Sequence, residues 1–264
     1  DRRLSLGLAS VPLFVLCPRA SESPSFAPAE ESTLTKLFHT ELEVAISDFS
    51  VLLAGADPGA PEMQLEGKWQ REVRITDTYG LTKAGRPLEL ERSFEAIDYE
   101  LEYEMTVDEQ GSTGDGSGEG SSELTDKQVR FTWDEEESAY TRSYVGGEGD
   151  TDLLDGLAED MDLRAFLPAE AVEEGDSWEL EPKTFLDACV PGGSVTLVLT
   201  VGYPPHDPRF PVVGIDPLTI ATLENWLGGE TTGAVTAKLA GTREEDGRKL
   251  AVLELEVDLE CESD

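Results

Sequence analysis

The chain has 264 residues, of which 56 are acidic and 20 are basic, so its formal net charge is −36. A surface with this charge repels phosphate groups, which excludes nucleic acids as partners and excludes direct binding to anionic membranes. The acidic residues are spread along the chain. This pattern is typical of solubility or of adaptation to salt, with a basic protein partner as the alternative.

The N-terminal segment has the pattern of an export signal. Arg2 and Arg3 precede an apolar run that ends at Cys17. The run is too short to span a bilayer, and it predicts a signal peptide or lipoprotein signal over residues 1–20. Acylation of Cys17 would leave a lipid anchor, whereas ordinary cleavage within residues 20–27 and a buried N-terminal strand are the alternatives. We therefore expect an exported protein of the periplasm or cell envelope.

A stretch rich in Ser, Pro, Ala and Glu follows at residues 21–33, and this composition predicts a disordered tether. Beyond it, apolar and polar residues alternate along most of residues 34–264, which predicts a single β-rich domain. Strands are expected at residues 34–46, 63–79, 88–94, 99–107, 127–133, 139–145, 195–201, 234–244 and 248–260. The last strand runs nearly to the end of the sequence, which is typical of a fragment truncated at the C-terminus.

Other segments interrupt the strands. The Gly, Ser and acidic residues of 110–122 predict an exposed, mobile loop. Short helices are expected where apolar residues recur every three or four positions after a capping residue. These segments are 153–161 with Asp152 as cap, 182–189, and 217–227 with Asp216 as cap. The turn at Gly175 then leads to a strand that begins near Trp178, and we expect this side chain to be buried.

Together these elements predict a mainly β fold. We expect an antiparallel curved sheet or half-barrel, with a few short helices packed on the open side. One face of each strand is apolar and therefore needs a cover, because a sheet with one apolar face is stable only when that face is buried.

Several motifs carry a resemblance to known proteins. They are Gly85-Arg-Pro, Arg92-x-Phe, Val129-Arg-Phe-Thr-Trp, Leu153-x-Asp-Gly-Leu-x-Glu-Asp-Met-Asp-Leu, Leu167-Pro and Val172-x-x-Gly-Asp-Ser-Trp. This set resembles a group of uncharacterised exported bacterial proteins, and the resemblance implies export without implying an activity. The long strands with helices between them are also similar to the half-barrel of lipoprotein carriers, which is an open curved sheet with an apolar concave face.

The best candidates for a metal site are Asp150, Asp152 and Asp155, because calcium takes six to eight oxygen ligands and clustered carboxylates can supply them. Their spacing differs from that of an EF-hand, and the alternative is a solvated helix start whose acids favour the positive end of the helix dipole. We expect no calcium site of micromolar affinity. His39 and His206 have no cysteine or carboxylate at ligand spacing, so the sequence predicts no zinc site, cofactor or catalytic residue.

Other candidates concern ligand binding and thiol chemistry. The apolar face could hold a hydrophobic ligand, although the same residues are equally typical of an ordinary core. The candidate ligand-facing residues are Trp69, Tyr103, Met105, Phe131 and Trp133. An oxidising envelope would allow a disulfide between Cys189 and Cys261, with two separate buried thiols as the alternative.

These observations favour a non-catalytic exported protein of the cell envelope, with a structural or binding role. One alternative is a carrier of hydrophobic ligands or lipids. A second is a calcium-dependent hydrolase, which would need carboxylates converging in a cleft. A third is a surface interaction module for a basic partner, which would be favoured if the negative charge were concentrated on one face.

Overall fold

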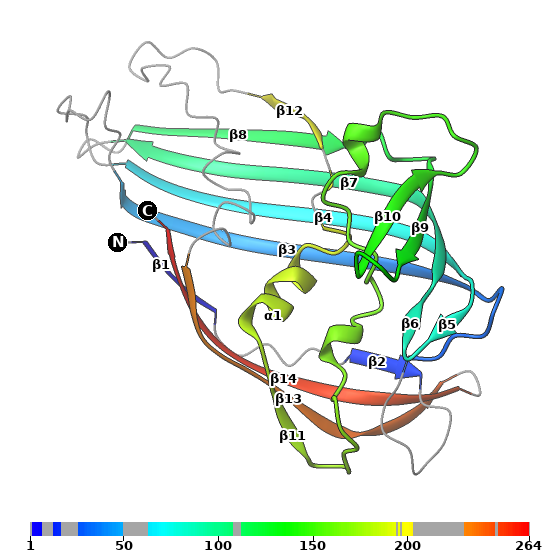
Figure 1. Cartoon of the computed structure of the whole chain (residues 1–264). Helices are drawn as coiled ribbons and strands as arrows, with labels where there is room; N and C mark the ends of the chain where they lie inside the picture. Colours follow the sequence, from blue (N-terminus) through cyan, green and yellow to red (C-terminus); the bar gives the residue numbers. More distant parts are fainter. Residues whose placement is uncertain are drawn as a thin grey trace.

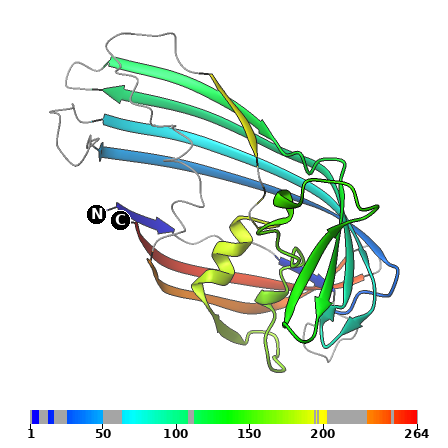
Figure 2. The same ribbon diagram turned by 45° about the horizontal axis from the view of Figure 1, so that its top comes forward.

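The computed structural model describes residues 2–6, 13–16, 26–49, 63–107, 112–193, 195, 197–202, 230–245 and 248–263. The protein is mainly β, with 60% strand in antiparallel sheets, one short helix and two 3-10 turns among the described residues. The predicted fold class is therefore confirmed. Figure 1 shows two curved sheets that lie one above the other, with the short helix α1 (Pro182–Cys189) between them. Figure 2 shows the same layers turned by 45°.

The larger sheet has the order β10-β9-β7-β4-β3, and β8 and β12 extend it beside β7. Its strands form because apolar and polar residues alternate over long stretches, which places one kind on each face. The residues expected as two strands at 88–94 and 99–107 form one continuous strand. The bounds are β3 (Thr33–Phe49), β4 (Met63–Tyr79), β7 (Glu89–Val107), β8 (Ser112–Ser121), β9 (Gln128–Asp134), β10 (Ala139–Tyr144) and β12 (Val198–Gly202).

The smaller sheet has the order β1-β14-β13-β11, and β2 also pairs with β14. Its centre is the hairpin of β13 and β14, which the Asp-Gly turn signal predicts. A two-stranded pair, β5 (Thr82–Lys83) with β6 (Arg86–Pro87), forms a separate small sheet in the connection between β4 and β7. The bounds in the smaller sheet are β1 (Arg2–Leu6), β2 (Leu13–Leu16), β11 (Ser177–Leu180), β13 (Glu230–Glu245) and β14 (Arg248–Ser263).

The N-terminal segments lie along β14. The backbone of β1 pairs with β14 from Arg2 opposite Ser263, and β2 pairs with it from Leu16 opposite Leu250. This pairing corresponds to the strand alternative, while removal of residues 1–20 as an export signal stays a prediction. Cys17 lies outside the described residues. No helix in the described part of the chain is long and apolar enough to cross a membrane.

Part of the expected tether is packed against the domain. The Phe26 ring meets Tyr79 edge to face with ring centroids 5.6 Å apart. The Glu31 backbone N–H donates to the Tyr79 carbonyl, and the Tyr79 N–H donates to the Ser32 carbonyl. Residues 26–32 are therefore ordered by contacts with the larger sheet, and the remainder of 21–33 up to residue 25 lies outside the described residues.

The middle helices differ from expectation. The predicted α-helix at 153–161 is wrong: the structure has a 3-10 turn, η1 (Thr151–Leu154), capped by Asp150 and not by Asp152. Gly156, with φ of 75°, takes the chain out of helical conformation just after this turn. A second 3-10 turn, η2, spans Arg164–Phe166. The helix expected at 182–189 is confirmed as α1 (Pro182–Cys189), and the one expected at 217–227 lies outside the described residues.

The mobile loop expected at 110–122 is also wrong, because most of it is strand β8, paired with both β7 and β12. Its glycines explain the pairing. Gly116 stands opposite Tyr103, and a Cβ there would lie 2.4 Å from the Tyr103 ring. On the other side of Tyr103 stands Gly67 of β4, whose missing Cβ leaves room for the Trp69 ring. The glycines thus make space for large aromatic side chains on neighbouring positions, as in aromatic rescue of glycine in sheets.

Each sheet has its own hydrophobic core. The first core lies on the larger sheet and includes Ile75, Leu90, Phe131, Leu157 and Met161. The second lies on the smaller sheet, under η2 and α1, and its members are Phe166, Leu186, Val235, Ala237, Leu239, Ala251, Leu253, Leu255, Val257 and Leu259. The two clusters share no residue, and in the described part of the chain the segment from η1 to α1 contributes side chains to both, Leu157 and Met161 to the first and Phe166 and Leu186 to the second.

Leu163 marks the point where the chain passes from one core to the other. Its φ is 56° and its ψ is 33°, which is left-handed backbone that a leucine rarely adopts. Beyond it, Trp178 opens β11 and is half-buried, with its Nε1 donating to the Phe166 carbonyl at 3.1 Å. The prediction of a buried Trp178 is therefore correct in position but overstated in degree.

Candidate functional site

A cluster of buried charges lies on the inner face of the larger sheet, beside the first core. At its centre are Asp77 of β4 and Arg92 of β7, whose side chains are both fully buried. Arg92 Nε and Nη2 donate to the two Asp77 oxygens at 2.8 and 3.0 Å. Burial alone would raise the pKa of Asp77, but the charge and hydrogen bonds of Arg92 outweigh it, so this pKa lies below its ordinary value.

Lys36 of the neighbouring strand β3 enlarges the cluster. Its Nζ lies 2.7 Å from Asp77 Oδ2 and 2.5 Å from Asp162 Oδ1. The Tyr79 hydroxyl donates to the same Asp162 oxygen at 2.6 Å. Burial and these carboxylates raise the pKa of Tyr79, so the phenol stays protonated and keeps donating. The cluster therefore ties three strands to the segment that contains Asp162.

This segment, residues 158–164, is here called the strap, because it crosses the inner face of the sheet and is held by cations. Arg92 donates to the Ala158 carbonyl at 2.8 Å and to the Glu159 carbonyl at 2.7 Å. Arg164 forms ion pairs with Glu159 and with Asp160, the latter at 3.1 Å. All donor nitrogens of Arg92 are thus engaged with its own chain.

Two carboxylate oxygens in the strap have no hydrogen-bond partner, Glu159 Oε1 and Asp162 Oδ2. Burial is the main influence on Glu159 and raises its pKa, although Arg164 acts in the opposite direction. A raised pKa is consistent with a carboxyl group in which only one of the two oxygens has a hydrogen-bond partner. The arrangement joins segments of the fold, and none of its cations is directed away from them.

The sequence does not predict this cluster as a unit, although it contains a signal for it. Arg92 belongs to the Arg-x-Phe motif, and Glu159, Asp160 and Asp162 belong to the motif that ends at Leu163. The sequence could not show that one motif's cation binds the backbone of the other. A lone arginine at an inward position of a strand is itself informative, because a buried charge requires a partner.

The predicted ligand-facing residues are not brought together. Trp69 and Tyr103 are buried, with 4% and 6% exposure, and lie in neighbouring rows of β4 and β7, outside both core clusters. Phe131 is in the first core opposite Leu90, at the other end of β7. Trp133 lies beyond it and is half-buried, with the Arg86 guanidinium 3.8 Å from its ring centroid. The side chain of Met105 lies outside the described residues.

The candidate calcium ligands have structural roles in the η1 turn. Asp150 Oδ1 accepts a hydrogen bond from the Asp152 backbone N–H at 3.0 Å, as a cap, and Asp155 follows the turn. Within the described ranges, no group of three or more His, Cys, Asp or Glu residues is placed to hold a metal ion.

Of the two candidate disulfide partners, only Cys189 has a described side chain. Cys189 ends α1 and is a half-buried free thiol, and burial raises its pKa to about 11. The backbone of Cys261 belongs to β14, but its side chain is not described. Their pairing under oxidising conditions therefore stays a prediction, and the raised pKa makes Cys189 a poor nucleophile at neutral pH.

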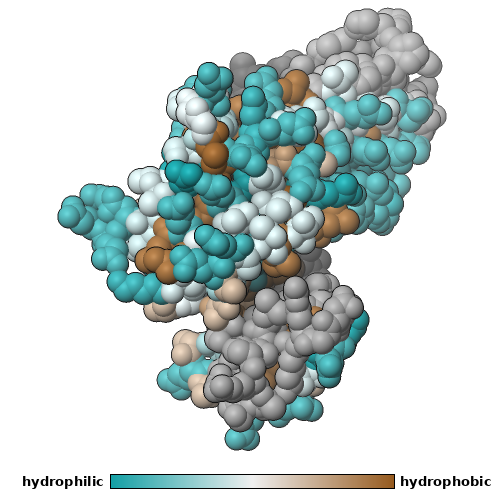
Figure 3. All heavy atoms as spheres, turned by 90° about the vertical axis from the view of Figure 1, so that its right-hand side faces the viewer, coloured by the Kyte–Doolittle hydropathy of each residue, from teal (hydrophilic) through white to brown (hydrophobic). Residues whose placement is uncertain are grey.

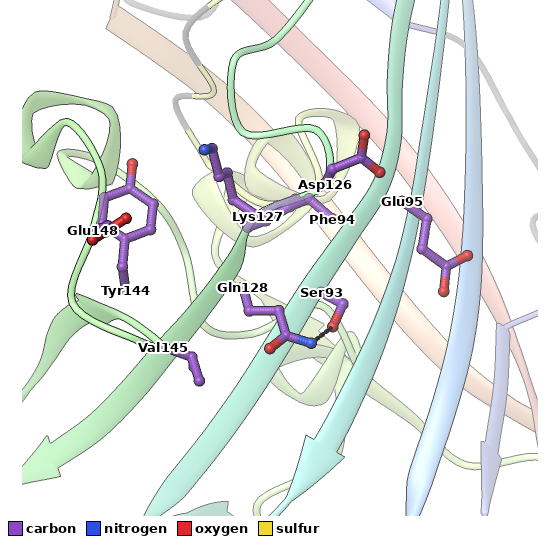
Figure 4. Close-up of a pocket in the computed structure, with 9 residues that line it drawn as sticks. All are labelled: Ser93, Phe94, Glu95, Asp126, Lys127, Gln128, Tyr144, Val145 and Glu148. Atoms are coloured by element: carbon purple, nitrogen blue, oxygen red, sulfur yellow. Dashed lines mark hydrogen bonds between the residues drawn. The ribbon is translucent and has the colours of Figure 1, made fainter.

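An open pocket of about 430 Å³ lies where β7 meets β9 and the end of β10. Figure 4 shows its lining side chains, with Gln128 donating to the Ser93 hydroxyl at 2.9 Å. Its charged lining residues are Glu95, Asp126, Lys127 and Glu148. The pocket is mixed in charge and open to solvent, and its groups do not converge on one point in Figure 4.

The outer face of the larger sheet is strongly acidic. Residues directly opposite each other in the register include Glu66 with Glu104, Glu104 with Asp115, and Glu100 with Glu119. The described acids of this face on β3, β4, β7 and β8 include Glu41, Glu43, Glu66, Glu72, Asp98, Glu100, Glu102, Glu104, Asp115 and Glu119, and Glu89 and Glu91 near the start of β7, which are paired with Arg130 of β9. The cations among them, Lys68 and Arg74, are already paired with Glu41 and Glu72 at 3.1 Å.

The surface at one end of the molecule is less uniform. Figure 3 views the end that carries β9, β10 and the β5–β6 pair, and shows hydrophilic residues interrupted by separate hydrophobic groups. Exposed large hydrophobic residues in the described part of the chain are Leu37, Leu81 and Val198, which lie on different elements. Scattered apolar residues of this kind are normal on a protein surface.

The sequence and the fold were also compared with known proteins. No protein-family model matches this chain, and no curated protein or solved structure is significantly similar to it.

Proposed function

We propose that the protein is a non-catalytic binding protein of the cell envelope, whose curved sheet is a scaffold and whose acidic outer face binds a basic partner. The observation that carries this proposal is the concentration of carboxylates on one face of four adjacent strands. The resemblance of the motifs to exported bacterial proteins supports the location, and the N-terminal pattern supports export.

The energetics of the outer face support a role in binding. Like charges directly opposite each other across strands destabilise a sheet by a few tenths of a kcal/mol or more per pair. Glu104 stands between Glu66 and Asp115 in one row, so this row contains two such contacts. A basic partner would relieve this repulsion, and complementary charge would also speed the encounter.

The experiment must distinguish binding by one acidic face from non-specific attraction by the net charge, because acidic residues are also favoured for solubility alone. Two variants carry the same change in charge: Glu100→Gln, Glu102→Gln, Glu104→Gln on β7, and Glu254→Gln, Glu256→Gln, Asp258→Asn on β14. Binding of a 20-residue polylysine would be measured by calorimetry at about 50 and 200 mM salt.

We expect the β7 triple variant to lose several-fold more affinity than the β14 triple variant, with the loss largest at low salt. An equal loss in both variants would show that net charge alone attracts the probe, and the proposal would then be wrong. Circular dichroism of each variant controls for folding, because these side chains are exposed and their replacement should leave the fold unchanged.

A carrier of hydrophobic ligands is the second candidate, and one observation favours it. The Trp69 Nε1 donor is buried without a hydrogen-bond partner, on a part of the inner face outside both cores. A buried unpaired donor is costly and would be satisfied by an acceptor on a ligand. The burial of Trp69 and Tyr103 favours the scaffold instead.

Hydrophobic-dye titration separates the two candidates. Saturable binding of one dye per chain, displaced by a fatty acid and weakened by Trp69→Phe without loss of fold, would move the carrier to first place. We expect no such binding, since the aromatic rings fill the space left by Gly67 and Gly116.

A further inference from the structure

Strand β3 forms one edge of the larger sheet over 17 residues. Within the described ranges, its only partner strand is β4. Figures 1 and 2 both show β3 separated from the strands of the smaller sheet. A long edge strand offers a row of backbone N–H and C=O groups to any further strand.

The register shows which residues offer these groups. The Tyr79 N–H donates to the Ser32 carbonyl, and the register then continues without irregularity to Ile46. In an antiparallel pair, hydrogen-bonded positions alternate with positions whose backbone groups point away from the partner strand. The even-numbered residues of β3 therefore bond to β4, while Leu37, His39, Glu41 and Glu43 direct their backbone groups to the open edge.

The side chains beside this edge differ between its two faces. Leu37, Glu41 and Glu43 are exposed on the outer face, and Leu37 is 57% exposed. On the inner face, Phe38 is only half-buried, whereas its β4 neighbour Val73 is 1% exposed. An added strand would therefore meet carboxylates on one face and a partly exposed aromatic ring on the other.

We propose that β3 binds an extended peptide segment of a basic partner by strand addition, with Lys or Arg opposite Glu41 and Glu43 and apolar residues on the inner face. This inference rests on the proposed function, since it names the way in which the basic partner binds. Backbone hydrogen bonds supply affinity in strand addition, and the alternating side chains supply specificity. Opposite charges directly across two strands contribute favourably.

A second copy of the chain is a poorer occupant. Antiparallel pairing of two β3 strands over their full length, with Thr33 opposite Phe49, would place Glu41 of one copy opposite Glu41 of the other, which is unfavourable. A segment with alternating basic and apolar residues complements both faces, so the expected occupant is a peptide of another protein.

The test uses three acetylated and amidated peptides of eight residues. The first repeats Lys-Val four times, the second repeats Glu-Val four times, and the third is the Lys-Val peptide with every Lys backbone nitrogen methylated. In antiparallel addition, the Lys residues stand opposite the odd-numbered residues of β3, so their N–H groups point to the edge. Methylation removes these donors and leaves the charge unchanged.

We expect one Lys-Val peptide to bind per chain in calorimetry, with the methylated peptide binding at least about tenfold more weakly, since it loses several hydrogen bonds. His39→Pro should weaken the Lys-Val peptide by about tenfold, because proline removes an outward N–H without removing a bond to β4. His39→Val is the matched control, since it keeps the N–H, and it should bind as the unaltered chain does.

The outcomes separate this inference from the proposed function. If the methylated peptide binds as well as the Lys-Val peptide, strand addition is wrong while a basic partner is still supported. If the Lys-Val peptide binds no better than the Glu-Val peptide, both proposals are wrong. The methylated peptide keeps the test valid even if His39→Pro impairs folding. Size-exclusion chromatography of the free chain would overturn the choice of occupant if it showed a dimer that His39→Pro dissociates.

Discussion

The two cores of this protein are built on different principles. The core of the larger sheet surrounds a buried network of charges, in which Asp77 and Arg92 are fully buried and paired, and Arg92 also binds the backbone of the strap. The core of the smaller sheet consists of aliphatic and aromatic side chains. The stability of the first core therefore depends on the pairing of charges, and hence on pH. The stability of the second depends on the volume and shape of its side chains.

The largest effect should come from removing Arg92. Arg92→Met leaves Asp77 buried without its main partner, and breaking one side of a buried pair costs about 3–5 kcal/mol. Urea unfolding measures the loss. The double variant Arg92→Met with Asp77→Leu should recover much of it, because no unpaired charge then remains. A double variant that is as unstable as the single one would show that packing is what the arginine contributes.

The corresponding change in the second core is Leu253→Ala. Leu253 is fully buried on β14, and deleting such a side chain costs about 2–4 kcal/mol through lost burial and the cavity left behind. The loss should be the same at pH 5 and pH 8, since no titratable group belongs to this cluster. A clear pH dependence of the loss would break the comparison between the two cores.

A smaller effect is expected where a glycine admits an aromatic ring. Gly116→Ala would place a Cβ 2.4 Å from the Tyr103 ring, and overpacking of this kind costs about 1–3 kcal/mol. Ser117→Ala, on the exposed face of the same strand, is the control and should cost little. Thermal unfolding measures both. Equal stability of the two variants would mean that β8 is not packed against Tyr103.

The subtlest effect concerns Glu159, whose pKa is raised by burial. The folded state then holds a proton more tightly than the unfolded state, so this group favours folding at pH below about 4.5 and loses that contribution as the pH rises through its folded pKa. Glu159→Gln should therefore improve in stability, relative to the unaltered chain, between pH 4 and pH 8. The opposite trend would show that the pairing with Arg164 outweighs burial.

Much of the fold follows from the sequence pattern. Strict alternation predicts β3, β4, β7, β13 and β14, because only an extended chain puts every second side chain on one face. The error at residues 110–122 has a clear cause. Glycine and serine are typical of loops, yet in β8 they leave room for Tyr103, and that requirement comes from the neighbouring strand. Composition alone cannot show it.

The candidate sites were less predictable than the fold. The turn at Asp150 to Asp155 has the composition of a helix start, but Gly156 ends it, and the contacts of Arg92 with the strap join residues far apart in sequence. An inward arginine indicates that a partner is needed, but nothing local in the sequence identifies that partner. The acidic outer face, by contrast, follows directly from the alternation of Glu with apolar residues along 99–107.

The left-handed residue Leu163 has a consequence for how the protein unfolds. Immediately before it, Asp162 is bound to Lys36 and Tyr79 of the larger sheet, and shortly after it Phe166 is buried in the second core. Residues 163–165, which lie between these two attachments, are too few to form a flexible linker. Opening of either core would therefore pull on the other. We expect a single cooperative melting transition, with calorimetric and van't Hoff enthalpies in agreement, instead of two separate ones.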